Sequence, residues 1–270
     1  MTIQRRVQEL YLQKFNELHV SNARPETQAQ KHAMQHAFER ALAEYPNECA
    51  STLWKCVHSA HITRKSGAEL TSEQINEVIS AEQSWKKSSG HAFEEFLPKF
   101  YNPSLEEHGI KICLQREVSS LLTNNQLHNR PRDIEILSAW LGQGVFDLYT
   151  VVCHEGRNFV IGTIQAKTSI RDRVTRDREP AIQAMETFFW ATAIVLDGDF
   201  LRLPKFQAMV NGGTRNFSQN GWHGMYVFSE LERNDRIYDQ SDFVQHCVIA
   251  KDLWLNERQE FDINWYPNSD

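Results

Sequence analysis

The chain has 270 residues, which is enough for one large domain or for one domain with an appended subdomain. A hydrophobic fraction of 41% and a charged fraction of 24% are ordinary for a soluble globular protein, and no apolar run approaches the ~20 residues of a membrane span. The net charge of -6 argues against a general affinity for nucleic acid, although it leaves room for a local basic surface.

Two features of the sequence indicate a cytoplasmic protein. Residues 1–10 lack the apolar core of a secretory signal peptide. The five cysteines are scattered and contain no CxxC pair, so we expect free thiols in a reducing compartment rather than a disulfide framework or a cysteine-rich zinc site. We therefore expect a cytoplasmic protein with no membrane partner.

Residues 1–87 are predicted to form an all-helical N-terminal subdomain, because apolar residues recur there at helical spacing and no strand pattern occurs. The pattern T-S-E-Q at 71–74 is typical of a capping box and predicts the start of the last of these helices. The expected helices cover about 7–18, 26–44, 50–65 and 71–87.

Residues 88–270 are predicted to form an α/β domain. A new helix is expected to start at 88–90, to kink at Pro98 and to end or turn at Asn102-Pro103. The other expected elements are a strand at 110–115, a loop at 118–133, a hairpin at 145–167, a helix at 180–196, a loop at 202–221, and strands at 225–228 and 243–250.

The hairpin at 145–167 is the clearest β pattern in the chain, and its strands are apolar on both faces, as in a central, covered sheet. It delivers Asp147 and, 20 positions later, Lys167, with Gln165 on the same face as Lys167 because side chains alternate along a strand. Hydrolysis of a phosphodiester uses a divalent metal held by acidic oxygens, often with a lysine nearby. The pattern D…QxK is close to the D…(D/E)xK motif of a large nuclease superfamily, and a surface ion pair at strand ends is the alternative.

Gln165 stands where that motif has an acid, and a glutamine brings an oxygen but no charge. A second acid would have to come from elsewhere. Asp177 and Glu179 are the nearest candidates after Lys167, and Glu94 on the earlier helix is another. From 157 to 178 there are six basic residues against two acidic ones, which indicates a basic surface on an acidic chain.

The triplet Arg171-Asp172-Arg173 lies within this basic stretch. Arginine is the commonest bidentate reader of guanine, and aspartate can accept a hydrogen bond from cytosine N4. The triplet therefore predicts either the reading of adjacent G·C pairs or a solvated charged helix.

Three segments together resemble the CCGG family of type II restriction endonucleases, in particular its AgeI- and BsaWI-like branch within the PD-(D/E)xK superfamily. They are S-G-H-A-F-E at 89–94, V-F-D-L at 145–148 and I-Q-A-K-T-S-I-R-D-R-V-T-R-D at 164–177. The resemblance covers roughly 85–180, with a similar helical part before it. It implies an α/β fold with a restriction-endonuclease-like core, in which helices flank a central mixed β-sheet.

The resemblance also implies roles for single residues. Asp147 would be the principal metal ligand and Lys167 the catalytic lysine. Asp177 would be the second acid, moved from the strand to the following segment, with Glu179 as the alternative. Glu94 would be a secondary ligand or would orient water.

Arg171, Asp172 and Arg173 would read the CCGG core, and Ser169 would contact a phosphate or a base edge. The activity implied is Mg²⁺-dependent cleavage of double-stranded DNA at a palindrome containing CCGG, by a bacterial homodimer that leaves 5′ overhangs. Two alternatives remain open. One is a repair or nicking nuclease of the same fold, and the other is a cleavage-deficient sequence-specific DNA-binding protein, which Gln165 keeps open.

Three other groups carry weaker indications. His32 and His36 are spaced to share a metal on a helix, but without a third ligand nearby ordinary helix histidines are favoured. The glycine-containing segment 211–215 has the composition of a DNA-contacting loop or of a common turn. Trp222-His223 follows a glycine-containing loop and could reach DNA, but an aromatic residue of the core or of a loop is favoured.

Overall fold

A computed structural model of the chain describes residues 2–22, 24–66, 72–169, 174–231, 234–256 and 260–267. The chain divides into two compact units, Met1–Phe96 and Leu97–Asp270, and each is described by itself. This division falls later in the chain than the predicted domain boundary between 87 and 88. The assignment of catalysis and DNA recognition to a domain of residues 88–270 stays a prediction.

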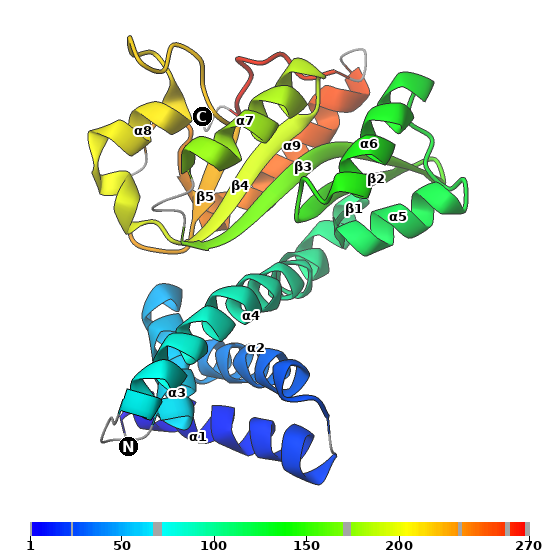
Figure 1. Ribbon diagram of the computed structural model, residues 1–270. Coiled ribbons are helices and arrows are strands. Elements are labelled where there is room, and N and C mark those ends of the chain that lie inside the picture. The colour runs from blue at the N-terminus through cyan, green and yellow to red at the C-terminus, as the bar shows by residue number, and fades with distance from the viewer. Residues whose placement is uncertain are drawn as a thin grey trace. The chain divides into compact units, whose positions relative to one another are not determined.

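The regular elements of the first unit are all helices in the part of the chain that the structure describes, as the sequence predicts (Figure 1). Its elements are α1 (Ile3–Asn16), a π-helical turn (Glu17–Ser21), α2 (Glu26–Glu44), α3 (Ala50–Ser66) and the part of α4 (Ser72–Leu105) before Leu97. Thr2 caps α1 by accepting a hydrogen bond from the Arg5 amide at 3.4 Å. Buried alanines at 33, 37 and 41 let α2 pack closely against α1 and α3. The predicted second and third helices are confirmed.

One long helix, α4, replaces the two helices predicted on either side of 88–90, so the predicted break there is wrong. Ser88 and Ser89 are buried rather than exposed at a helix end, and the apolar positions on both sides of them, from Ala81 to Phe96, are buried as well. A glycine inside a helix costs only about 1 kcal/mol, which such packing outweighs. Pro98 and Pro103 also lie inside α4, which ends at Leu105, two residues after the end or turn predicted at 102–103.

The second unit is built on a six-stranded mixed sheet with the strand order β1-β2-β3-β4-β5-β6. The strands are β1 (Ile110–Leu114), β2 (Leu148–His154), β3 (Arg157–Ser169), β4 (Trp190–Asp197), β5 (Gly224–Val227) and β6 (Ile237–Asp239). The first three strands pair antiparallel, and β3 to β6 pair parallel. The fold class expected from the sequence, a mixed sheet flanked by helices, is confirmed.

The predicted hairpin is β2 and β3. Its two-residue turn is Glu155-Gly156, and both residues have positive φ angles, of 50° and 74°. A two-residue hairpin turn of type I′ requires this backbone conformation, which glycine adopts freely. Strand β3 lies between β2 and β4, in the interior of the sheet.

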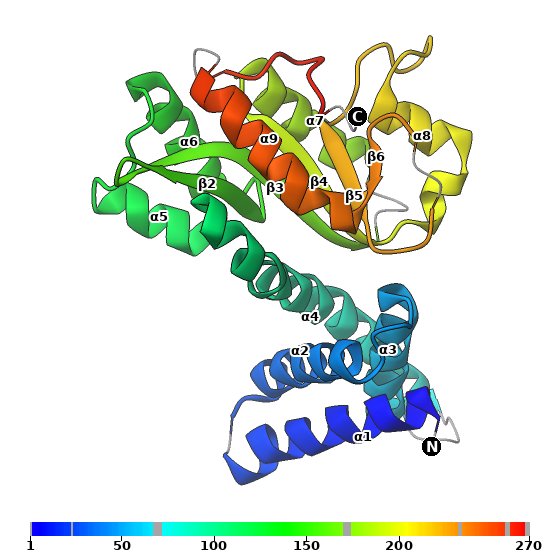
Figure 2. The ribbon, with the colours of Figure 1, turned by 180° about the vertical axis from the view of Figure 1, so that it is seen from behind.

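Helices cover both faces of the sheet, which explains why its central strands are apolar on both faces. In Figure 1, α6 (Pro131–Gln143) and α7 (Val174–Glu186) lie over one face, and Figure 2 shows α9 (Phe243–Asn256) across the other. The core on the α6 and α7 side contains side chains from both helices and from β2 to β6. Two further helices are α5 (Gln115–Thr123) and α8 (Pro204–Asn211).

Four predictions for the second unit are wrong in whole or in part. The expected loop at 118–133 contains most of α5, which buries only Val118 and therefore shows little apolar pattern. The expected helix at 180–196 is the end of α7 followed by β4, a central strand with seven successive buried residues that resembles a buried helix in sequence. The expected loop at 202–221 contains α8, and the expected strand at 243–250 is the first half of α9.

Helix α9 shows how the strand prediction failed. Its buried residues include Phe243, Cys247, Ala250 and Trp254, which recur at helical rather than alternating spacing. The strands predicted at 110–115 and 225–228 are confirmed by β1 and β5. In the part of the chain that the structure describes, no helix combines the length and the apolar character needed to cross a membrane.

Candidate active site

Asp147 and Lys167 form an ion pair at adjoining strand ends. Asp147 directly precedes β2, and its Oδ2 atom lies 3.0 Å from Lys167 Nζ. The same Oδ2 accepts a hydrogen bond from the Ala166 amide at 2.8 Å. Both side chains are about one quarter exposed, at 23% and 24%, so water and a substrate can reach the pair.

Gln165 lies on the same strand but is buried, with 3% of its surface exposed. Its Oε1 accepts a hydrogen bond from the indole N–H of Trp222 at 2.8 Å, and its Nε2 donates to the backbone carbonyl of Asp177 at 2.8 Å. Because both ends of the amide are bound within the protein, Gln165 acts here as a link between β3 and α7.

Asp177 lies in the first turn of α7, where a carboxylate is favoured by the positive end of the helix dipole. Its carbonyl contacts Gln165, and its Oδ2 atom is buried. Glu179, the alternative acid, is exposed. Asp147 and Asp177 therefore contact three consecutive residues of β3. Asp147 contacts Ala166 and Lys167, and the backbone of Asp177 contacts Gln165.

Arg178 ties the same turn of α7 to a more distant segment. Its Nε donates to the Met209 carbonyl at 3.1 Å, a second guanidinium nitrogen donates to the Gln219 carbonyl, and the guanidinium lies over the Phe217 ring. Burial lowers the pKa of Arg178 from its ordinary value. The sequence identified Arg178 only as one of several basic residues, and no pattern in it indicated these partners.

Glu94 lies on the part of α4 that belongs to the first unit. Its Oε2 lies 3.1 Å from His91 Nδ1. Since Asp147 belongs to the second unit, a shared role for Glu94 and Asp147 stays a prediction.

The predicted base-reading triplet Arg171-Asp172-Arg173 lies outside the described residues. Ser169 ends β3 and pairs by its backbone register with Asp197 of β4, and its side chain lies outside the described part as well. The DNA contacts assigned to these residues therefore stay predictions.

The donor set of the Asp147 region fits a hard divalent cation. Mg²⁺ is usually held by one or two carboxylates together with waters and phosphate oxygens. Both contacts of Asp147 with Lys167 and Ala166 go to Oδ2, so Oδ1 is the oxygen that suits a metal. Among the residues that the structure describes, no three histidines, cysteines or acidic residues are gathered as a complete protein ligand set, so a metal here would need oxygen ligands from water and DNA.

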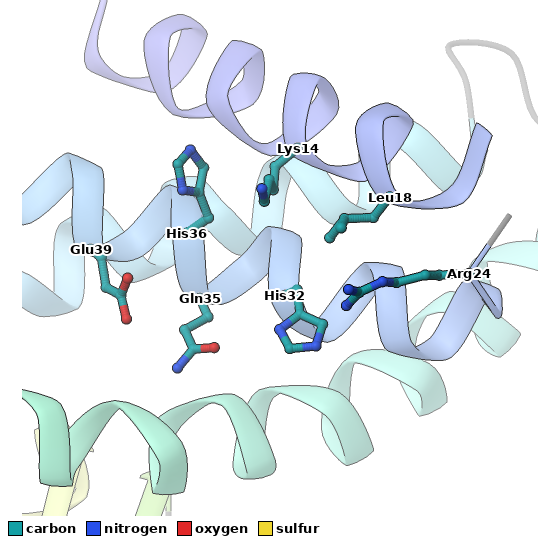
Figure 3. Close-up of a pocket in the computed structure, with 7 residues that line it drawn as sticks. All are labelled: Lys14, Leu18, Arg24, His32, Gln35, His36 and Glu39. Carbon is teal, nitrogen blue, oxygen red and sulfur yellow. The ribbon is translucent and has the colours of Figure 1, made fainter. Parts of the chain in front are cut away.

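His32 and His36 line a cavity of about 290 Å³ in the first unit, together with Lys14 and Arg24 (Figure 3). Burial, followed by the positive charge of Lys14 and Arg40, lowers the pKa of His36. A cation is disfavoured beside two basic side chains, and the described residues there contain no three-ligand cluster. These histidines therefore do not support the metal site that their spacing allowed.

The mixed sheet, with an aspartate and a lysine paired on its central hairpin, places the chain in the class of restriction-endonuclease-like proteins. Residues 126–254 match the family described as BsaWI restriction endonuclease type 2, a range that contains Asp147, Lys167 and Asp177 but not Glu94. The solved structure of a pre-specific restriction endonuclease BsaWI–DNA complex is 48% identical, with a TM-score of 0.70 over 100% of both chains.

AgeI is a second relative. The type II restriction enzyme AgeI of Thalassovita gelatinovora is 29% identical over 151 residues, which are 54% of this chain and 48% of AgeI, so this match spans about half the length of AgeI. The solved structure of a specific restriction endonuclease AgeI–DNA complex has a TM-score of 0.61 at 19% identity, over 92% of this chain and 91% of that one, and shows the same fold. The chain belongs to the BsaWI restriction endonuclease family, on the AgeI/BsaWI branch of the type II restriction endonucleases.

Proposed function

We propose that this protein is a type II restriction endonuclease that cuts both strands of DNA at a palindrome containing CCGG, with Mg²⁺, and leaves 5′ overhangs. The observation that carries the proposal is the 3.0 Å contact between Lys167 Nζ and Asp147 Oδ2 on the central hairpin. The full-length similarity to the BsaWI–DNA complex supports DNA as the substrate.

Cleavage requires that a water attack phosphorus while the bond to the leaving oxygen breaks and that oxygen gains a proton. A bound Mg²⁺ would supply Lewis acidity to the scissile phosphate and to the attacking water. Asp147, through Oδ1, and Asp177 would hold the ion. Lys167 places its positive charge 3.0 Å from Asp147 Oδ2, where it can stabilise negative charge that develops on the phosphate. Glu94 would orient the water or act as a secondary ligand.

Recognition is assigned to the segment that follows β3. Arg171 and Arg173 would donate bidentate hydrogen bonds to guanines, Asp172 would accept from cytosine N4, and Ser169 would contact a phosphate or a base edge. Because the site is a palindrome, two copies related by a two-fold axis would each present this segment to one half-site. The homodimer is therefore part of the proposal, as is a location in the bacterial cytoplasm, which the five free cysteines support.

Digestion of plasmids of known sequence with Mg²⁺ tests the proposal. Discrete fragments whose sequenced ends map to CCGG sites with 5′ overhangs are the expected result. Nicks or smears without a common end sequence would instead favour a repair or nicking nuclease, and specific binding without any cleavage would favour the cleavage-deficient DNA-binding protein.

Asp147→Asn and Lys167→Ala test the site assignment. Each should lower the single-turnover cleavage rate by roughly 10²-fold or more while leaving sequence-specific binding in place, because each removes a charge from the reacting centre. Lys205→Ala is the matched control, since Lys205 is an exposed lysine on α8 that has no assigned role in the site. Cleavage at the wild-type rate by either site variant would refute the assignment.

A further inference from the structure

We infer that Gln165 is a positioning residue, whose amide is held by Trp222 and in turn fixes the turn of α7 that carries Asp177. The inference rests on the proposed function in one respect, the assignment of Asp177 as the second acid of the metal site. It replaces a simpler interpretation, in which Gln165 only marks a position from which an acid has been lost.

The orientation of the Gln165 amide is fixed by the chemistry of its two partners. An indole N–H can only donate a hydrogen bond, and a backbone carbonyl can only accept one. The oxygen of Gln165 must therefore face Trp222, at 2.8 Å, and its nitrogen must face the Asp177 carbonyl, also at 2.8 Å. A flipped amide would bring two donors together at one end and two acceptors at the other.

Gln165 and its partner Trp222 both lie in the interior of the second unit. The backbone of Gln165 lies in the interior of the sheet, opposite Ala193 in the parallel register of β3 and β4. Trp222 is fully buried within the core on the α6 and α7 side. The sheet therefore holds the backbone of Gln165, and Trp222 holds its side chain. Together they fix the position of the amide N–H that Gln165 donates to α7.

The first turn of α7 is held from a second direction by Arg178, which bonds to the carbonyls of Met209 and Gln219. Gln165 and Arg178 thus act on consecutive residues, 177 and 178, from β3 and from the 209–219 segment. The place of the Asp177 carboxylate follows from the place of this turn, so a neutral side chain sets the position of an acid.

A glutamate at 165 would break this arrangement rather than restore a missing acid. A carboxylate has no N–H to give, so one of its oxygens would face the Asp177 carbonyl at the site of the present hydrogen bond. The new charge would also be buried, because the side chain at 165 is almost fully enclosed. The two interpretations of Gln165 therefore predict opposite effects of Gln165→Glu.

The test measures Mn²⁺ affinity by electron paramagnetic resonance, on the full-length wild type and on variants bound to a CCGG duplex. Trp222→Phe removes the indole N–H and keeps an aromatic ring in the core. Tyr226→Phe is the matched control, because it removes one buried hydroxyl bond, to His246 at 3.0 Å, elsewhere in the same unit. Thermal unfolding of all variants separates a general loss of stability from a local one.

The expected result is a fall in Mn²⁺ affinity of roughly two- to tenfold in Trp222→Phe, which corresponds to one hydrogen bond, and a fall at least as large in Gln165→Glu. Tyr226→Phe should keep the wild-type affinity. Wild-type affinity in Trp222→Phe, or a higher affinity in Gln165→Glu, would overturn the positioning role. A wild type that binds Mn²⁺ but does not cut the duplex would instead refute the proposed function, and the affinities of the variants would still decide the role of Gln165.

Discussion

Lowering the pH should destabilise the second unit through His223, a fully buried imidazole. Its Nδ1 accepts a hydrogen bond from the Ala191 amide at 3.0 Å, and its Nε2 donates to the Asp262 carbonyl at 3.0 Å. A proton on Nδ1 would face another donor, and burial lowers the pKa of His223 to about 3, with a smaller effect of the nearby Arg236 charge.

The sign and the size of the effect follow from this pKa. Above pH ~6.5 the imidazole is neutral in both the folded and the unfolded chain, so the contribution of His223 to the free energy of unfolding is fully present. As the pH falls below 6.5, the unfolded chain takes up a proton that the folded chain refuses, and stability falls until the pH reaches about 3. Since pH 5 lies about 1.5 units below the pKa of a histidine in the unfolded chain, the free energy of unfolding is lower there by about 2 kcal/mol.

Urea unfolding of the wild type and of His223→Gln at pH 8 and pH 5 measures this contribution. The free energy of unfolding should fall between the two pH values by about 2 kcal/mol more in the wild type than in His223→Gln. His61, whose pKa burial lowers to about 4, adds the same pH dependence to both proteins and cancels in the comparison. His154→Gln, at an exposed position, should behave as the wild type. An equal pH dependence in the wild type and in His223→Gln would refute the reasoning.

Two further predictions concern packing and thiol chemistry. Gly162→Ala would place a Cβ atom 2.7 Å from the Trp190 carbonyl oxygen and should lower the free energy of unfolding by about 1–3 kcal/mol, measured by urea unfolding. Gly142→Ala is the control, because nothing lies within 4 Å of the added atom, and it should stabilise α6 by up to about 1 kcal/mol. Equal effects of the two variants on the free energy of unfolding would contradict the packing argument. Cys153 is exposed, whereas burial raises the pKa of the Cys113 thiol to about 12 and that of Cys247 well above its ordinary value. With a colorimetric thiol reagent, Cys153→Ser should therefore lose the fastest reacting thiol and Cys113→Ser should keep it, and a fast phase that survives in Cys153→Ser would show that exposure does not set the order.

The parts of the fold that depend on local pattern were predictable from the sequence. The hairpin has alternating side chains and a two-residue turn, so Asp147 and Lys167 could be paired from their spacing alone. Helices α2 and α3 follow from helical spacing and clear ends.

Elements whose burial is complete or whose pattern is weak were not predictable. Strand β4 is buried almost throughout, and a fully buried strand and a buried helix share the same apolar run. The link from Gln165 to Trp222 joins residues 57 positions apart, and neither residue carries a pattern that names the other. The role of Gln165 therefore comes from the three-dimensional fold, although the absence of an acid at this position was visible in the sequence.

The sequence separations within the site limit when a growing chain can complete it. Asp147 and Lys167 are 20 positions apart on one hairpin, so their contact becomes possible as soon as β3 has left the ribosome. The Trp222 N–H that orients Gln165 comes 57 residues after that glutamine, beyond α7, β4 and α8 in the chain. A chain that ends before Trp222 can therefore form the aspartate–lysine pair, but it lacks the residue that holds the Gln165 amide. The proposed metal site, with Asp177 as its second acid, can reach its final form only late in synthesis.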